Sequence, residues 1–342
     1  MGNNVRIAFD AMGGDLGPAA AVEGALLALS KYDDMTIILT GREEEIMKAL
    51  EGKEYDKERL SVVNADDVIT NDDPPVEAIM KKKDSSMVKA LKMLKSGEAD
   101  AVLSSGSTGA LLTGGMGIAG RIKGVRRSPL APLIPTLKGM ALLVDCGANV
   151  DCKPEDIVQF AKMGSVYFSE YMDKKDPVVK IVNVGAEEEK GNQMTKEAYA
   201  LLKECPDINF GGNIEARDIP AGAADIIVCD AFVGNVIMKM YEGVADAFLS
   251  IIKGAIYSGT LSKIGGALIK KPLKEALKGF KSSDYGGAPM LGLNGLVVKA
   301  HGNSNANAFS IALGQCYDFV KKDIRGKTEE KFGAIREEDK KA

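Results

Sequence analysis

The chain has 342 residues, 45% of them hydrophobic and 27% charged, which is ordinary for a globular protein with one large α/β domain or two smaller ones. Lysines and arginines number 44 against 48 aspartates and glutamates, so the formal charge of −4 excludes the basic footprint of a nucleic-acid binder. Five cysteines without a CxxC pair, and a single histidine, argue against a disulfide framework and a Cys/His zinc site.

The N-terminal stretch has no charged-then-apolar leader, and no apolar run approaches the roughly 20 residues that a membrane span needs. We therefore expect a cytoplasmic protein with reduced cysteines and no metal.

Apolar, β-rich runs alternate with helical patterns along most of the chain. The expected strands are, in order, VRIAFD, MTIILTG, LSVVNA, ADAVLS, MALLVDCG, PVVKIVNVG, INFGG, ADIIVCD and GLVVKAHG. The clearest helical patterns cover residues 85–95, 110–121, 154–172 and 194–203. This alternation predicts βαβ units and an α/β fold with a mostly parallel sheet and helices on both faces.

No tandem repeat or low-complexity linker divides the chain. We therefore expect a single α/β domain over residues 1–326. The tail from 327 to 342 is rich in charge, and we expect it to be frayed.

Five glycine- and hydroxyl-rich loops each follow an expected strand and precede a helix. They are DAMGGD, SSGSTGA, DCGANVD, NVGAEEEKGN and CDAFVGN. Ligands of open parallel sheets bind outside the carboxyl ends of the strands. The sequence therefore predicts a cleft lined by these loops, with Asp145 and Asn149 of the third loop among the substrate-binding residues.

The SSGSTGA loop has the best local chemistry for an anion. Ser105, Ser107 and Thr108 offer hydroxyl donors, while Gly106 and Gly109 allow the backbone to approach a ligand closely. The alternative is an ordinary helix N-cap, since serine and threonine are favoured there.

The opening loop also has two interpretations. Gly13 and Gly14 form either a tight turn before a proline-started helix or a backbone cradle for an anion. Asp10 and Asp15 complicate the second interpretation, because bare carboxylates repel phosphate. They would instead position a basic residue or bind amide groups of a larger substrate.

Each later loop has a functional and a structural interpretation. Lys190 lies beside three glutamates, as in a solvated loop, and Asp230 with Asn235 resembles a helix-capping pair. His301 also follows a strand and precedes a helix, although a lone histidine is more often structural.

The segment 256–280 is basic and amphipathic. Apolar residues form one helical stripe before Pro272 and another after it, which predicts two amphipathic helices broken by the proline. Residues 260–281 contain six lysines and one glutamate. We expect a helical protrusion at about 250–284 that meets a membrane surface or a hydrophobic partner groove, or that forms a dimer with its lysines in solvent. The two stripes consist of Leu261, Ile264 and Leu268, then Leu273, Ala276, Leu277 and Phe280.

Eight motifs occur in an order that resembles a known family. They are IAFDAMGGD, KKKDSSM, GRIKG, DCGANVD, the NVG…KGN loop, GNIEARD, the GNV of CDAFVGNV, and KAHG. Together they are similar to the bacterial phosphate acyltransferases of phospholipid synthesis over nearly the whole chain.

The resemblance implies transfer of a fatty acyl group from acyl carrier protein to inorganic phosphate, without a cofactor. A membrane-bound glycerol-phosphate acyltransferase would then consume the acyl phosphate. The resemblance also implies a Rossmann-like fold akin to phosphotransacetylases and isopropylmalate dehydrogenases, a homodimer, and peripheral association with the inner face of the cell membrane.

Two catalytic assignments follow from matching motifs. Lys190 matches the family's KGN lysine and Asn235 its TGN-type asparagine. The chain departs from the family pattern where Ser107 replaces an asparagine, Val233 a threonine and Asn305 an acid.

In the expected mechanism, phosphate attacks the thioester carbonyl itself, so no enzyme nucleophile is needed. The SSGSTG loop would hold phosphate, Lys190 and Asn235 would stabilise charge, and His301 would assist. The acidic carrier protein or the membrane would meet basic and apolar side chains of two segments. These are Lys81, Lys82, Lys83, Leu261, Lys263, Ile264, Leu268, Lys270 and Lys271.

Two rival functions remain open from the sequence. One is a β-decarboxylating dehydrogenase, which needs a metal-binding carboxylate cluster and a nicotinamide site. The other is a lipid-responsive membrane scaffold without turnover, which uses the amphipathic segment alone.

Overall fold

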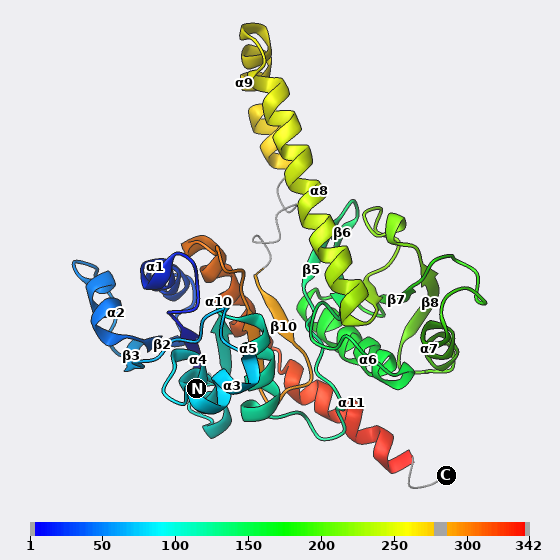
Figure 1. Cartoon of the computed structure of the whole chain (residues 1–342), viewed down its shortest axis with the longest axis horizontal. Coiled ribbons are helices and arrows are strands. Elements are labelled where there is room, and N and C mark those ends of the chain that lie inside the picture. Colours follow the sequence, from blue (N-terminus) through cyan, green and yellow to red (C-terminus); the bar gives the residue numbers. More distant parts are fainter. Residues whose placement is uncertain (1–3, 277–285, 339–342) are drawn as a thin grey trace.

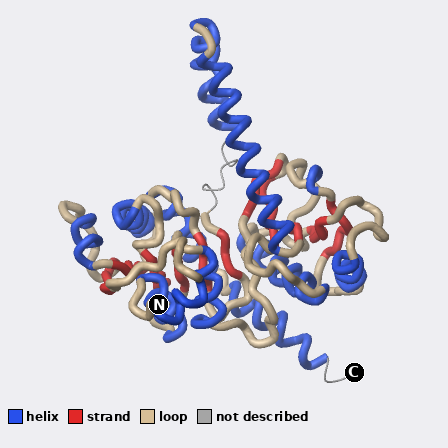
Figure 2. Tube along the Cα trace, viewed as in Figure 1, coloured by secondary structure: helices blue, strands red, loops and turns tan. Residues whose placement is uncertain are grey.

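The computed structural model describes residues 4–276 and 286–338, which form two α/β lobes with a helical protrusion between them (Figure 1). Each lobe contains its own twisted sheet, so the one sheet expected from the alternating pattern is two sheets. Both are mostly parallel and flanked by helices, which confirms the predicted fold class (Figure 2).

The first lobe contains a six-stranded sheet of order β10-β11-β4-β1-β2-β3. Its parallel strands are β1 (Val5–Asp10), β2 (Met35–Gly41), β3 (Leu60–Asn64), β4 (Ala101–Ser104) and β11 (Leu296–Lys299). Its helices are α1 (Gly17–Leu29), α2 (Glu43–Leu50), α3 (Pro75–Lys81), α4 (Ser86–Ser96), α5 (Thr108–Gly114) and α10 (Ala306–Lys321). A π-helical turn, Gly115–Ala119, continues α5.

The second lobe contains a five-stranded sheet of order β5-β6-β9-β7-β8. Its parallel strands are β6 (Gly139–Val144), β7 (Val178–Val182), β8 (Asn209–Ile214) and β9 (Ile226–Val228). The helices α6 (Pro154–Tyr171) and α7 (Gln193–Lys203) cover it, and a short 3₁₀ turn, Ala216–Asp218, follows β8.

Two edge strands were not expected from the sequence. These are β5 (Leu133–Thr136) and β10 (Ala288–Met290), each paired antiparallel to its neighbour. Both contain a proline, Pro135 or Pro289, which cannot donate a ladder hydrogen bond and is tolerated only at a sheet edge. Their shortness and their prolines remove the strand signal from the sequence.

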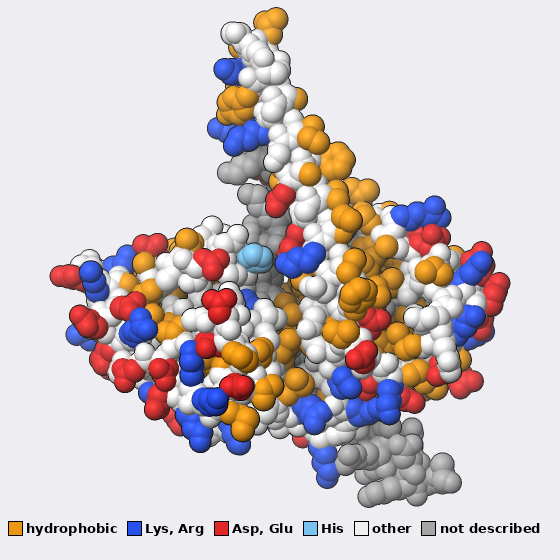
Figure 3. All heavy atoms as spheres, viewed as in Figure 1, with side chains coloured by type: hydrophobic (Ala, Val, Ile, Leu, Met, Phe, Trp, Pro, Cys, Tyr) orange, Lys and Arg blue, Asp and Glu red, His pale blue; other side chains and the backbone are white. Residues whose placement is uncertain are grey.

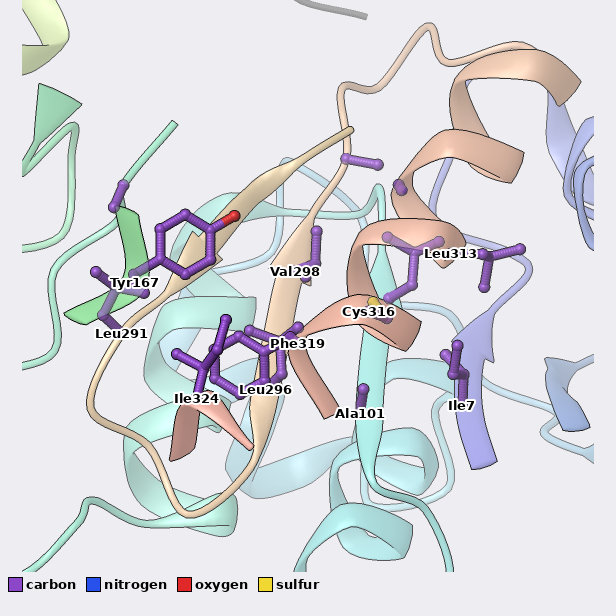
Figure 4. Packing of buried hydrophobic residues seen from close by; sticks show 14 of the residues in the cluster. Ile7, Ala101, Tyr167, Leu291, Leu296, Val298, Leu313, Cys316, Phe319 and Ile324 are labelled. Atoms are coloured by element: carbon purple, nitrogen blue, oxygen red, sulfur yellow. The ribbon is translucent and has the colours of Figure 1, made fainter. Parts of the chain in front are cut away.

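A buried interface joins the two lobes. The side-chain amide of Gln315 in α10 donates a 2.9 Å hydrogen bond to the hydroxyl of Tyr167 in α6. Around it, Leu296, Phe319 and Ile324 pack with Tyr167 in one continuous core (Figure 4). Because this contact is apolar and fully buried, it holds the lobes in a defined arrangement.

The C-terminal segment differs from its expected frayed state. Helix α11 spans Ile324–Glu338 and packs back on α6 of the second lobe. Phe332 is only 3% exposed, and Lys327 forms an ion pair with Glu170. The apolar residue inside a charged stretch is what anchors the helix, so the expectation of fraying is wrong for residues 327–338.

Two helices form the protrusion: α8 (Ala231–Tyr257) and α9 (Thr260–Ala276) (Figure 1). At about 1.5 Å per residue, α8 is about 40 Å long. Pro272 lies inside α9, so the expected break at this residue is wrong; Leu277 and Phe280 lie outside the described residues. Within the described ranges, no helix is long and apolar enough to cross a membrane.

Candidate functional site

Three side chains form a row across the carboxyl end of the first sheet. The register pairs Lys299 of β11 with Ser104 of β4, and Ser104 with Asp10 of β1. Residues paired in register on parallel strands point to the same face. The Ser104 hydroxyl donates a 2.7 Å hydrogen bond to Asp10, and the Lys299 ammonium donates to the carbonyl oxygen of Ser105 at 3.1 Å.

The two glycine loops expected to hold an anion contact each other directly. A Cβ on Gly13 would lie 2.4 Å from the backbone nitrogen of Gly106, so only glycine permits this approach. Gly14 lies against the Ser105 hydroxyl, whose oxygen is buried without a hydrogen-bond partner among the described residues. The backbone N–H of Asp15 donates to the carbonyl oxygen of Gly302, which brings the KAHG segment to the same place.

The rest of the SSGSTG loop opens α5. The Ser107 hydroxyl faces the backbone N–H of Ala110 in the N-cap position, at a long 3.5 Å. Thr108 is exposed in the first turn, and Gly109 lies against Pro75 of α3. The cap interpretation therefore holds for Ser107, while the Thr108 hydroxyl lies at the surface.

Burial shifts the pKa values of two groups in this row, Asp10 and Lys299. Burial raises the pKa of Asp10 above its ordinary value, although hydrogen bonds from Ser86, Ser104 and the Met12 N–H oppose this shift. Burial also lowers the pKa of Lys299 to about 8, against the attraction of Asp10 and Asp15.

In the second lobe, Asp145 organises the loop after β6. Its buried carboxylate accepts hydrogen bonds from the backbone N–H groups of Leu130, Ala148 and Asn149 and from the Asn149 side chain. Burial raises the pKa of Asp145 despite these donors. Asn149 in turn donates to the carbonyl oxygen of Ser128. Both side chains are thus committed to the fold of the loop.

Helix α8 begins against this same loop. The Asp230 carboxylate caps the helix by accepting from the Val233 N–H at 2.9 Å. A Cβ on Gly234 would lie 1.8 Å from the Asp145 carbonyl oxygen, so glycine is required for the contact. Asn235, the next residue, is exposed in the first turns of α8. The local fold therefore places its amide at the carboxyl edge of the second sheet.

Lys190 is held through its backbone by two asparagines that the sequence did not single out. The Asn183 amide donates to the Lys190 carbonyl oxygen at 3.0 Å and to the Asn213 side chain at 3.1 Å. Asn213 donates to the carbonyl oxygen of Glu187 at 2.8 Å. Both asparagines are buried, whereas the Lys190 side chain is exposed. The sequence contained them only as members of the NVG and GNIEARD motifs at strand ends, without a role.

The candidate residues thus fall into two groups that lie on different lobes. Loops after the adjacent strands β6, β9 and β7 carry Asn149, Asn235 and Lys190, and the row with Lys299 lies on the other lobe. The histidine, His301, is exposed between the lobes (Figure 3). Among the described residues, the structure shows no hydrogen bond or ion pair between the Lys190 or Asn235 side chain and the SSGSTG loop.

Four of the five cysteines are poor nucleophiles in this fold. Burial raises the pKa of the Cys146, Cys229 and Cys316 thiols, and that of Cys152 to about 12, so these thiols stay protonated. In the part of the chain that the structure describes, no three His, Cys, Asp or Glu side chains group as metal ligands.

The two expected contact segments differ in how far their side chains are available. Lys82 forms an ion pair with Asp73, while Lys81 and Lys83 are exposed beside it. In α9 the expected apolar stripe is exposed, with Leu261 at 85% and Leu268 at 78%. The remaining residues of this stripe region, Lys263, Ile264, Lys270 and Lys271, are exposed as well.

Known proteins share this architecture. The chain superimposes on a phosphotransacetylase from Streptococcus pyogenes with a TM-score of 0.56 at 18% identity, over 93% of this chain and 95% of the other. The EutD phosphotransacetylase from Staphylococcus aureus gives 0.57 at 15% identity, over 92% and 95%. At these identities the likeness concerns the fold, which is the two-lobed phosphotransacetylase type.

Relatives found by sequence identify the family, whereas the solved structures identify only the fold. A family profile described as fatty acid synthesis protein matches residues 5–327. A phosphate acyltransferase from Clostridium botulinum (strain ATCC 19397 / Type A) is 51% identical over 315 residues, which is 91% of this chain and 94% of the relative. A phosphate acyltransferase from Clostridium perfringens (strain SM101 / Type A) is 50% identical over 328 residues, 96% and 97% of the two chains. The chain belongs to this family of fatty acid synthesis proteins, which confirms the resemblance found in the sequence.

Proposed function

We propose that this chain is an acyltransferase that moves a fatty acyl group from acyl carrier protein to inorganic phosphate and releases acyl phosphate for phospholipid synthesis. The observation that carries the proposal is the pair of interlocked glycine loops beside Lys299, in a family whose relatives are named phosphate acyltransferases. The buried, protonated thiols support a reaction in which the second substrate is itself the nucleophile.

In this reaction a phosphate oxygen attacks the thioester carbonyl carbon and forms the new C–O bond. The tetrahedral oxyanion then collapses, the C–S bond breaks, and the carrier thiolate leaves and takes a proton from solvent. Lys190 offsets the charge of phosphate and the oxyanion, and Asn235 donates a hydrogen bond to the oxyanion. The two lobes bring the anionic reactants together, with His301 between them.

The reaction is tested with purified protein, palmitoyl–acyl carrier protein and phosphate, trapping acyl phosphate with hydroxylamine. Replacing one oxyanion donor costs about 10²–10³ in rate, so Lys190→Ala and Asn235→Ala should each lose activity to this extent. Lys196→Ala, an exposed lysine on the next helix, is the matched control and should keep full activity. Equal turnover in all four proteins would refute the assigned residues, and no turnover in the wild type would refute the reaction.

The protrusion supports two further parts of the proposal, a homodimer and contact with the inner face of the cell membrane. An apolar stripe on α8 is exposed along the protrusion (Figure 3) and would pair with a second copy. It consists of Phe232, Val236, Met240, Val244, Phe248 and Ile251. The α9 stripe with its lysines would lie on anionic lipid and release acyl phosphate to a membrane-bound glycerol-phosphate acyltransferase.

Separate variants test these contacts. Leu261→Asp with Leu268→Asp should abolish sedimentation with vesicles containing phosphatidylglycerol while soluble turnover remains. Phe248→Asp should shift the molar mass measured by light scattering from dimer to monomer. Vesicle binding unchanged in the first variant, or a dimer unchanged in the second, would refute the corresponding contact.

The acidic carrier protein would dock at the exposed lysines before α4. Lys82 is partly buried in its ion pair with Asp73, whereas Lys81 is 75% exposed even though it pairs with Glu77, so Lys81 and Lys83 carry this part of the proposal. Lys81→Glu with Lys83→Glu should raise KM for the acyl carrier protein with little change in kcat, and the effect should shrink with added salt. The same KM in the variant would place the docking surface elsewhere.

A further inference from the structure

We propose that the ammonium group of Lys299 is the cation of the first lobe that receives the phosphate ion. The inference rests on the proposed function, since it names a residue that binds its second substrate. The sequence indicated Lys299 only as part of the KAHG motif and gave it no role.

The placement of Lys299 is determined by the sheet. Register with Ser104 puts it at the carboxyl end of the sheet, beside the strand that leads into the SSGSTG loop. Its ammonium contacts the carbonyl oxygens of Ser105 and Ala300. These two acceptors satisfy two of the three N–H bonds of a lysine ammonium, which leaves one for a ligand.

Lys299 also resolves the difficulty posed by the carboxylates of the opening loop. Asp10 is fully buried in the row and Asp15 lies against Gly302, so phosphate would meet two acids if no cation stood between them. Lys299 is attracted to both. Unlike Asp10 and Ser104, Lys299 is only partly buried, so part of its side chain is accessible to a ligand.

The charges around Lys299 predict that phosphate binding depends on pH and takes up protons. Burial lowers the pKa of Lys299 to about 8, Asp10 of β1 and Asp15 of the loop oppose that shift, and Lys239 of α8 adds to it. A phosphate dianion at the ammonium would raise the pKa again. At pH 8 about half of the Lys299 groups are neutral, so phosphate binding should take up as much as about half a proton there.

The first experiment measures phosphate KM between pH 6.5 and 9.5 with acyl phosphate trapping. Wild-type KM should rise above about pH 8 as the ammonium is lost. Lys299→Met should raise phosphate KM about 10–100-fold with a smaller change in kcat. Lys299→Arg should keep KM near wild type and abolish the rise with pH. Lys31→Met, which changes a lysine of the same lobe that bonds Ser310 of α10, should behave as wild type.

The second experiment measures proton uptake on binding inorganic phosphate, by calorimetry in buffers of different ionisation enthalpy. Uptake at pH 8 should be present in the wild type and absent in Lys299→Arg. Since Lys299→Met removes a positive charge that favours the ionised form of the buried Asp10, and could thereby unfold the protein, Lys299→Met with Asp10→Asn removes both charges. Its phosphate KM should stay high.

The outcomes separate the two proposals. A wild-type phosphate KM in the double variant, or uptake unchanged in Lys299→Arg, overturns the role of Lys299 while the reaction stands. A wild-type protein that neither binds nor consumes phosphate overturns the proposed function itself.

Discussion

Gly13→Ala tests whether the two glycine loops form the site by direct contact. The added methyl would lie 2.4 Å from the Gly106 nitrogen, whereas ordinary contacts begin near 3.4 Å, so the loops must separate by about 1 Å. Such overpacking costs about 1–3 kcal/mol of the free energy of unfolding. A displacement of about 1 Å at reacting groups costs about 100-fold in rate.

The assay pairs thermal unfolding with acyl phosphate trapping at saturating acyl donor. Gly117→Ala is the matched control, because it adds the same methyl in the same lobe where no atom lies within 4 Å. We expect its stability to change by less than about 0.5 kcal/mol and its activity not at all. If Gly13→Ala melts and turns over like Gly117→Ala, the loops are not in the close contact on which the site is built.

Three other variants probe the account. Asn213→Ala removes the hydrogen bond to the Glu187 carbonyl oxygen and should lower the free energy of unfolding by about 1–3 kcal/mol. It should also reduce kcat, because it frees the loop that carries Lys190, and a kcat equal to wild type would contradict this. Cys152→Ser should keep its activity from pH 6 to 9, because a thiol with a pKa of about 12 is protonated throughout that range, and a lost activity limb would indicate a thiolate. Tyr167→Phe removes the acceptor of the Gln315 amide between the lobes and should lower the free energy of unfolding in urea by about 1 kcal/mol, so unchanged stability would show that this bond contributes nothing.

Local patterns in the sequence predicted the elements better than their assembly. VRIAFD and MTIILTG coincide with β1 and β2, because alternation and β-branching act within a few residues. The division into two sheets is a long-range property, since β10 and β11 return to the first lobe after the whole second lobe. At Pro272 the local pattern failed, because helix α9 continues through a residue that usually ends a helix.

The candidate site was foreseen as a set of loops but not as a set of contacts. The loops after strands pointed to Asp10, Asp145 and Lys190, whereas the sequence did not pair them with the groups that position them. These groups are the Ser104 hydroxyl, the Leu130 N–H and the Asn183 amide. In the sequence Lys299 lies inside the expected strand GLVVKAHG and opens the KAHG motif, and only the register with Ser104 places it in the row. The sequence did raise the need for a basic residue beside Asp10, which the fold supplies.

The central claim is that phosphate itself attacks the acyl thioester. The most direct test supplies palmitoyl–acyl carrier protein with phosphate labelled by ¹⁸O at every oxygen and measures the mass of the acyl phosphate formed. We predict that the product retains every labelled oxygen, including the one that bridges carbon and phosphorus. A bridging oxygen without label, or free fatty acid in place of acyl phosphate, would contradict the account.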